Sequence, residues 1–236
     1  MPQPTVTLFV PTLNELIGMK ILMPQIKREW VDQILVVDGN STDGTAEYAR
    51  EQGYEVYIQK KKGIRFAFIE AWPLIRSDIV ITFSPDGNSV PGAIPQLIEK
   101  MKEGYDMVIG SRYLHGARSE DDGVITGFGN HIFTGTVNLL HGANYTDAMV
   151  MLRAYRTNLF YELDLHKDES YAPEKLWFTV MGIEPLLSVR AAKRKVKIGE
   201  IPADEPRRIG GVAKLQVIRW GGAYMTQFFR ELYYWK

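Results

Sequence analysis

The stretch Asp78-Ile79-Val80-Ile81-Thr82-Phe83-Ser84-Pro85-Asp86-Gly87-Asn88-Ser89-Val90-Pro91 is an apolar, β-branched run that ends in a short polar turn. The run predicts a strand, and the turn brings Asp86 and Asn88 to its carboxyl end, where α/β proteins bind ligands. Two oxygen ligands on one turn, with no Cys or His nearby, suit a hard cation such as Mg²⁺ or Mn²⁺. The alternative is a turn in which Asp86 and Gly87 only end the strand.

The composition sets limits on the class of protein. A chain of 236 residues fits one large α/β domain or two small ones. Its 28 basic and 28 acidic residues leave no bulk charge that would argue for nucleic acid as a partner. The absence of cysteine excludes disulfides and thiolate metal sites. We find no signal peptide and no window approaching about 18 consecutive apolar residues, so the expected location is the cytoplasm.

Strand and helix patterns alternate along the chain. This alternation predicts one α/β domain with a mainly parallel central sheet flanked by helices. The expected strands are residues 5–10, 33–38, 55–58, 78–83 and 106–110, and the expected helices are residues 16–30, 46–52, 65–76 and 93–103.

Polar residues gather where four of the predicted strands end. They occupy residues 11–15, 38–43, 86–88 and 110–112. Because the carboxyl ends of parallel strands share one edge of a sheet, we expect these four turns to converge on one cleft.

Two motifs near the N-terminus carry a resemblance to a known family. Pro11-Thr12-Leu13-Asn14-Glu15, followed by Val36-Val37-Asp38-Gly39-Asn40-Ser41-Thr42-Asp43-Gly44-Thr45, resembles the signature of family 2 glycosyltransferases, which are inverting enzymes with a GT-A fold. Residues 110–113, 146–147, 152–156 and 208–215 resemble the dolichyl- or polyprenyl-phosphate sugar synthase branch. We therefore expect a glycosyltransferase domain over residues 1–215 and a C-terminal amphipathic helix over residues 216–236.

The resemblance implies roles for individual residues. The nucleotide sugar would be bound by Pro11, Asn14, Glu15, Asp38 and Asp86. The metal would be held by Asp86 and Asn88. Phosphate or acceptor groups would be met by Arg112, Arg208 and Lys214, with Asp147 supporting the acceptor site or simply capping a turn. The catalytic set is Asp86, Arg112, Asp147 and Glu184.

This sequence departs from the pattern of the family in the metal turn and in the predicted acceptor helix. Family members usually read D-x-D at the metal turn, and here Ser84 replaces the first aspartate, which removes a carboxylate from the metal site. In the predicted acceptor helix, Asn130 and Thr134 occupy the positions where the lipid-phosphate enzymes tend to have Arg and Ser. These two changes weaken the case for a phosphate acceptor.

Two further features allow two interpretations each. Gly63, which follows the run Lys60–Lys62, either approaches the diphosphate or belongs to a solvated loop. Glu184 is either the base that a hydroxyl acceptor would need or a helix N-terminal carboxylate favoured by the helix dipole.

The functional hypothesis is an inverting transfer of a sugar from a UDP- or GDP-sugar to a polyprenyl phosphate, with Mg²⁺ or Mn²⁺ stabilising the leaving diphosphate. A hydroxyl of a cell-envelope glycan or a lipid-linked intermediate is the alternative acceptor. A sugar-nucleotide nucleotidyltransferase would need a glycine-rich, basic N-terminal loop, which residues 11–15 do not provide. A non-catalytic nucleotide-binding protein is the third class, favoured by Ser84.

The C-terminus is rich in aromatic residues. Trp220, Tyr224, Phe228 and Trp235 fit a helical spacing and alternate with cationic residues. Such a helix is typical of peripheral contact with a membrane interface, here the inner face of the membrane. The alternative is an aromatic face packed on the domain or on a second subunit of a homodimer.

Overall fold

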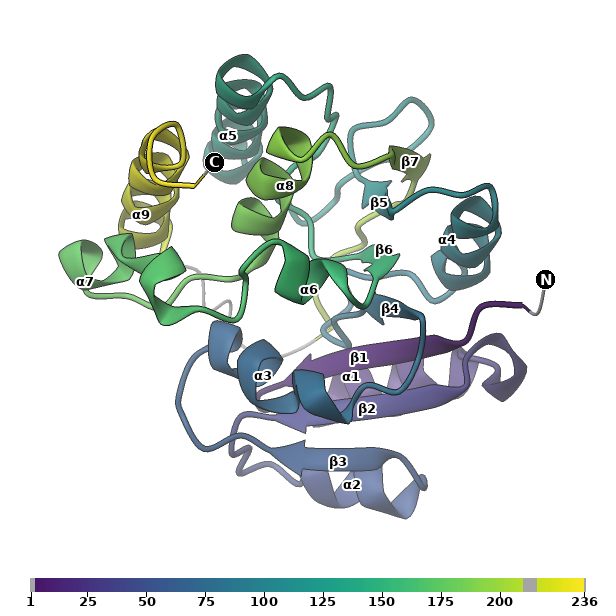
Figure 1. Cartoon of the computed structure of the whole chain (residues 1–236). Helices are drawn as coiled ribbons and strands as arrows, with labels where there is room; N and C mark the ends of the chain where they lie inside the picture. Colours follow the sequence, from purple (N-terminus) through teal and green to yellow (C-terminus); the bar gives the residue numbers. More distant parts are fainter. Residues whose placement is uncertain (1–2, 210–215, 236) are drawn as a thin grey trace.

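Seven strands form one sheet in the order β3-β2-β1-β4-β6-β5-β7 (Figure 1). The computed structural model describes residues 3–209 and 216–235. Strand β6 is antiparallel to its neighbours β4 and β5, and the other strand pairs are parallel, so the predicted mainly parallel sheet is confirmed. The strands are β1 (Val6–Thr12), β2 (Gln33–Asp38), β3 (Glu55–Ile58), β4 (Ile79–Thr82), β5 (Met107–Ser111), β6 (Arg153–Arg156) and β7 (Ile198–Pro202).

Helices cover both faces of this sheet (Figure 1). They are α1 (Leu16–Leu22), α2 (Thr45–Glu51), α3 (Ile64–Ala71), α4 (Ala93–Lys102), α5 (Val124–His141), α6 (Leu159–Glu162), α7 (Pro173–Trp177), α8 (Glu184–Lys193) and α9 (Val217–Arg230). Short 3-10 turns lie at Met23–Gln25, Arg28–Trp30, Trp72–Leu74 and Asp168–Tyr171.

The strands are apolar on both faces because each face has its own core. On one side Phe9 and Val37 pack with residues of α3, α5, α6, α8 and α9. On the other side Leu8 and Val36 pack with residues of α1, α2 and α4. This two-sided burial explains why the central strands read as continuous apolar runs.

Prolines account for the differences from the predicted element boundaries. The helix expected over residues 16–30 ends at Leu22, and a 3-10 turn containing Pro24 follows. The helix expected over residues 65–76 ends at Ala71, and Pro73 lies in the next 3-10 turn. A proline cannot donate the backbone hydrogen bond that a helix interior needs. Strand β1, expected to end before Pro11, continues through Pro11 to Thr12. Its pairing with β4 ends at Phe9, so Pro11 lies beyond that pairing.

The C-terminal helix α9 packs on the domain. Tyr224, Phe228 and Trp235 are buried in the same core as α5 and α8. Arg190 of α8 and Glu231, both fully buried, form an ion pair with Nε and Oε2 2.9 Å apart. The predicted aromatic row therefore turns inwards. None of the helices within residues 3–209 and 216–235 is long and apolar enough to cross a membrane.

Candidate functional site

The turns after β1 and β2 are joined by hydrogen bonds between side chains. Thr12 and Asp38 are in register, and the Thr12 hydroxyl donates to Asp38 Oδ2 at 3.0 Å. The Ser41 amide donates to Asp38 Oδ1 at 2.8 Å. Asn14 adopts a left-handed backbone (φ 56°), and its amide donates to Ser41 Oγ at 2.8 Å. Asn14 and Asp38, both predicted to bind the nucleotide, therefore lie at the same edge of the sheet.

The turn after β4 is held between a helix and a loop. A Cβ atom on Gly18 of α1 would lie 1.8 Å from the carbonyl oxygen of Pro85. On the other side the Ile209 amide donates to the carbonyl oxygen of Asp86 at 2.7 Å. Gly87 has φ 107°, and a Cβ atom there would lie 2.7 Å from the Ile209 nitrogen. Glycine at 18 and 87 thus allows two backbone segments to hold Asp86 in place.

Arg208 brings the predicted diphosphate residues together. Its Nη2 atom lies 2.9 Å from Asp86 Oδ2, and its Nη1 atom lies 3.8 Å from Glu15 Oε1. Asp86 and Glu15 are buried, and Arg208 is partly exposed. One cation shared by two carboxylates leaves these three groups with a net negative charge at the end of β4.

The oxygen atoms of the metal turn fit a hard cation. Asn88 Oδ1 is buried and has no hydrogen-bond partner within the described residues, while the backbone amide of Asn88 donates to Asp86 Oδ1 at 3.1 Å. Over the same residues, no group of three or more His, Cys, Asp or Glu side chains is arranged to hold a metal ion. The protein thus offers one carboxylate and one amide oxygen, and the further ligands of Mg²⁺ or Mn²⁺ would come from phosphates and water.

A second polar cluster forms at the end of β5. Arg112 Nε and Nη2 donate to the two carboxylate oxygens of Asp147, at 2.6 and 3.0 Å, and Nη1 donates to Glu205 at 3.2 Å. Burial lowers the pKa of Arg112, but Asp147 and Glu205 raise it by more than burial lowers it, so the pKa lies above its usual value. The guanidinium is therefore permanently charged and largely occupied by these carboxylates.

The two carboxylates of this cluster differ in their pKa. Burial raises the pKa of Asp147, but Arg112 and the Met149 amide outweigh burial and lower it below the usual value. Burial raises the pKa of Glu205, and Arg112 opposes that shift without cancelling it. Asp147 is thus fixed as an anion, whereas Glu205 accepts a proton more readily.

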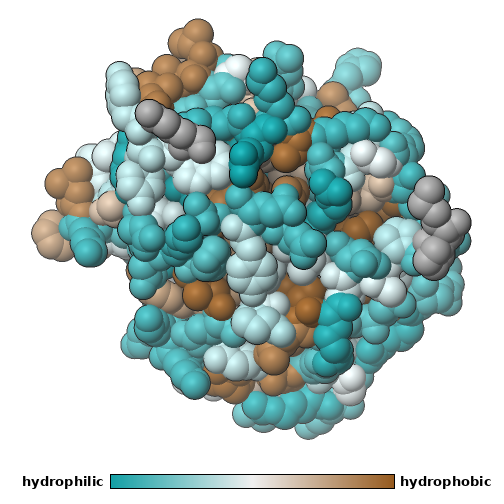
Figure 2. Space-filling view, viewed as in Figure 1, coloured by the Kyte–Doolittle hydropathy of each residue, from teal (hydrophilic) through white to brown (hydrophobic). Residues whose placement is uncertain are grey.

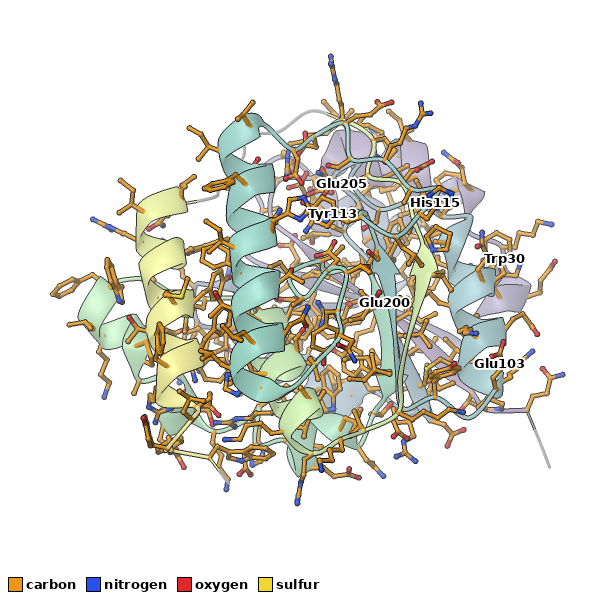
Figure 3. All side chains as sticks on the ribbon, turned by 90° about the horizontal axis from the view of Figure 1, so that it is seen from above. Trp30, Glu103, Tyr113, His115, Glu200 and Glu205 are labelled. Atoms are coloured by element: carbon orange, nitrogen blue, oxygen red, sulfur yellow. The ribbon has the colours of Figure 1, made fainter. Side chains whose placement is uncertain are left out.

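Helix α5 is tied to this cluster by its second and third turns. Asn130 Nδ2 donates to the Tyr113 hydroxyl at 3.1 Å and to Asp122 at 3.2 Å. Thr134 Oγ1 accepts the Ala148 amide at 3.1 Å, beside Asp147. Figure 3 shows Tyr113 and Glu205 lying near one another beside α5. Asn130 and Thr134 hold the loops around Arg112, and their binding of an acceptor stays a prediction.

The remaining predicted residues are Gly63, Glu184 and Lys214. Gly63 (φ 117°) begins α3, and a Cβ atom there would lie 2.6 Å from a methyl carbon of Val180. Glu184 is the first residue of α8. This is the position of a helix N-terminal carboxylate, the alternative to a role as a base. The Glu184 side chain is buried, and within residues 3–209 and 216–235 Oε1 has no hydrogen-bond partner. Lys214 lies outside the described residues.

Three acidic residues of the site, Glu205, Asp121 and Asp122, could not be identified from the sequence. Glu205 follows β7, but the strand sequence Ile198–Pro202 is broken by a glycine, a glutamate and a proline, which hid the strand end. Asp121 accepts the Asn88 side-chain amide at 2.7 Å and the Arg208 backbone amide at 3.3 Å. Asp122 and Asp121 belong to a loop with no periodic pattern, so only the folded chain brings them to the site.

Comparison with known proteins indicates one family, that of glycosyltransferases. The profile of the family described as Glycosyl transferase family 2 matches residues 7–164. The chain is 30% identical to glycosyltransferase AglJ of Haloferax volcanii, over 98% of this chain and 73% of the relative. It is 26% identical to the undecaprenyl-phosphate mannosyltransferase of Micrococcus luteus, over 90% of this chain and 92% of the relative.

Among solved structures, the fold is similar to glucosyl-3-phosphoglycerate synthase of Mycobacterium tuberculosis, whose crystals contain Mn²⁺, uridine diphosphate and phosphoglyceric acid. The TM-score is 0.68 at 18% sequence identity, covering 97% of this chain and 78% of that protein. At this identity the likeness concerns the fold.

Proposed function

Because the chain belongs to glycosyl transferase family 2, we propose that it transfers a hexose, with inversion, from a nucleotide-diphosphate sugar to a polyprenyl phosphate. The observation that carries this proposal is the placement of Arg208 between Asp86 and Glu15, beside the turns that contain Asn14 and Asp38. A relative named undecaprenyl-phosphate mannosyltransferase supports the choice of acceptor.

The nucleotide sugar would lie over the ends of β1, β2 and β4. The Asp38 carboxylate lies buried at the end of β2, where the resemblance places the nucleobase, and it accepts hydrogen bonds from Thr12 and Ser41. The exposed Asn14 lies next to it and donates its backbone amide to Ser41. Arg208 carries the positive charge that the leaving diphosphate requires, since its guanidinium already lies at the end of β4. To meet the diphosphate, Arg208 has to exchange Asp86 for phosphate oxygens.

Asp86 and Asn88 are the residues that would hold the divalent cation. When bound, the cation neutralises charge on the diphosphate as the bond to the sugar breaks. Ser84 supplies a hydroxyl where a carboxylate is common in the family, so we expect weak binding of the cation until the nucleotide adds its own oxygens.

The Arg112 cluster lies on the acceptor side in this proposal. Asp147 fixes the Arg112 guanidinium by two hydrogen bonds, which gives the group one orientation. A phosphate acceptor is already an anion, so it needs positioning behind the anomeric carbon rather than a strong base.

A hydroxyl acceptor is the second candidate, and one observation favours it. The charge of Arg112 is already balanced by Asp147 and Glu205, and the raised pKa of Glu205 suits a group that accepts a proton. A hydroxyl acceptor would use such a base, whereas a phosphate acceptor would not.

A panel of UDP- and GDP-sugars with Mn²⁺ tests the proposal. We expect transfer to a polyprenyl phosphate with one donor, and we expect Asp86→Ala to reduce turnover by about a thousandfold or more while the thermal unfolding midpoint stays close to that of the wild type. Glu99→Ala, at an exposed position on α4, serves as the control. Transfer only to alcohols would favour the second candidate, and unimpaired turnover by Asp86→Ala would refute the role of Asp86.

A further inference from the structure

Helix α5 carries apolar side chains on its solvent side. Its 18 residues include no Asp, Glu, Lys or Arg. Val124, Ile125, Phe128 and Ile132 are spaced to share one side of the helix, and Leu139 follows seven residues later on the same side. All five are exposed, Val124 by 92% and Leu139 by 84%. A surface helix normally presents charged residues to water, so α5 shows the reverse pattern.

Helices α9 and α7 extend this surface. A Cβ atom on Gly221 of α9 would contact the Phe133 ring of α5 at 3.4 Å. A Cβ atom on Gly222 would meet the Trp177 ring of α7 at 2.3 Å. The two glycines therefore let α9 lie closely between α5 and α7. The three helices form one layer at the upper left of Figure 1.

The outer side of this layer is apolar along its width. Ile218 and Phe229 of α9 are exposed, as are Leu176 of α7 and Phe178 just after it, with Ile218 at 82% and Phe178 at 83%. Figure 2 shows hydrophobic residues protruding at the top, over α5, and at the left, over α7. We refer to these four residues and the five on α5 as the apolar face. So many large exposed apolar residues on one layer mark an interaction surface.

The exposed charge of the layer has one sign. Helix α9 contains Arg219 and Arg230 and no acidic residue. In α7, Lys175 is exposed, whereas Glu174 is buried and paired with Arg65, with Nη2 and Oε2 2.7 Å apart. Within these three helices, the charged side chains that reach solvent are therefore basic, which suits an anionic partner.

We propose that the apolar face docks on the surface of an anionic lipid bilayer, with its aliphatic and aromatic side chains in the headgroup region and Arg219 and Lys175 beside lipid phosphates. Apolar side chains flanked by cations are the pattern of helices that lie in a membrane interface. A second copy of the chain fits less well. A two-fold contact would place the same basic face against itself, so its cations would repel each other.

The docked orientation brings the candidate acceptor side close to the lipid. Asn130, on the second turn of α5, bonds to Tyr113 and Asp122 of the site, and Phe128 of the apolar face lies two residues earlier. A polyprenyl phosphate held in the bilayer could then reach the Arg112 cluster without leaving the lipid. This consequence rests on the proposed function, whereas the docking itself does not.

Vesicle sedimentation of the full chain tests the docking. We expect the protein to sediment with vesicles of phosphatidylglycerol and phosphatidylcholine, and less with phosphatidylcholine alone. Phe128→Glu/Ile218→Glu should weaken binding by about tenfold or more, because two charges enter the apolar face. The matched control is Ile21→Glu/Leu74→Glu, which places the same charges on exposed aliphatic positions outside the face, and it should bind like the wild type.

A charge-reversal pair tests the choice of lipid. Arg219→Glu/Lys175→Glu should weaken binding to the anionic vesicles by about tenfold, whereas Lys27→Glu/Arg50→Glu, on the opposite side of the sheet, should change it less. Failure of the wild type to bind any vesicle, or equal binding by the Phe128→Glu/Ile218→Glu variant, would overturn the proposal. A dimer that this variant dissociates, with no vesicle binding, would show that the face is a subunit interface.

Transfer to a short, water-soluble polyprenyl phosphate separates this proposal from the proposed function. The docking variants should keep that activity while they lose vesicle binding. If the wild type binds vesicles but transfers no sugar, the proposed function fails and the docking stands. If it transfers sugar and never binds vesicles, the docking fails and the function stands.

Discussion

At the scale of single residues, the ion pair between Arg208 and Asp86 decides how the site responds to a metal. The Arg208 guanidinium holds the carboxylate that the cation would need. A partly exposed ion pair of this kind contributes about 0.2–1 kcal/mol. Arg208 and the cation therefore compete for Asp86 in the absence of nucleotide, and the diphosphate relieves the competition because it attracts Arg208.

Arg208→Ala should consequently change metal and nucleotide binding in opposite directions. We expect Mn²⁺ binding without nucleotide to tighten by up to about fivefold, as the strength of the ion pair implies. Nucleoside diphosphate binding should weaken, because a cation that meets phosphate is lost. Titration calorimetry measures both the Mn²⁺ affinity and the nucleotide affinity. The control is Arg207→Ala, which changes an exposed neighbouring arginine. Unchanged Mn²⁺ affinity in Arg208→Ala would rule out the competition.

Glu184 makes stability depend on pH. Burial raises the pKa of its carboxyl above the usual value of 4.5, and Arg153 opposes this shift only in part. Since the folded state binds the proton more tightly than the unfolded state, stability is greatest below pH 4.5 for this group and falls as the pH rises through the folded pKa. Glu184→Gln removes this loss.

We therefore expect Glu184→Gln to match the wild type near pH 4 and to be more stable at pH 8. A gain of about 1 kcal/mol would raise the unfolding midpoint by about 2–4 °C. Urea denaturation across this pH range measures the difference. A gap that stays constant with pH would contradict the raised pKa, and loss of transfer by a stable Glu184→Gln protein would favour its role as a base.

At the scale of elements, helix α1 and the turn after β4 depend on one glycine. A Cβ atom on residue 18 would lie only 1.8 Å from the carbonyl oxygen of Pro85. The contact involves backbone on both sides, so it cannot relax by a side-chain rotation. The position of Asp86 is thus set partly by a residue far from it in sequence.

Gly18→Ala should displace this turn. We expect a loss of about 1–3 kcal/mol in the free energy of unfolding, as for other overpacked sites, together with weaker donor binding. Gly92→Ala is the matched control, because a Cβ atom there would meet nothing within 4 Å and the residue has a helical backbone. Equal stability of the two variants would show that α1 shifts freely on the turn.

At the scale of the whole molecule, the C-terminal helix and the sheet share one core. Arg190 of α8 and Glu231 are both fully buried, and Gln227 Nε2 also donates to Glu231 at 2.7 Å. Phe228 and Tyr224 pack in the core that contains Phe9 of β1. We infer that residues 216–235 unfold together with the rest of the chain rather than as an appended helix.

Glu231→Ala tests this cooperation. Removing the carboxylate leaves the buried Arg190 charge unbalanced, and we expect a loss of about 3–5 kcal/mol in one transition. Tryptophan fluorescence and far-UV circular dichroism should give coincident curves. Glu162→Ala, at an exposed position on α6, is the control. A separate early transition, in which part of the helical circular dichroism is lost before the main unfolding, would contradict this cooperation.

The strands of the first half of the chain could be predicted because their signals are local. The runs ending at Asp38 and Thr82 are apolar on both faces, as buried parallel strands must be, and the polar residues after them mark the carboxyl edge. Strand β7 could not be predicted, because its sequence contains Gly199, Glu200 and Pro202 and its place depends on pairing with β5.

The sequence by itself determined the α/β sheet and the strand ends that carry Asn14, Asp38, Asp86 and Arg112, because each depends on a short apolar run and the turn after it. The motifs in the first two of these turns carried the resemblance to the family. Only the tertiary structure decided that Arg208 lies on Asp86 and that Glu205 and Asp147 enclose Arg112. It also decided that the aromatic row of α9 turns inwards while α5 exposes its apolar side. These contacts join residues dozens of positions apart, and burial of a helix side depends on its neighbours rather than on its own pattern.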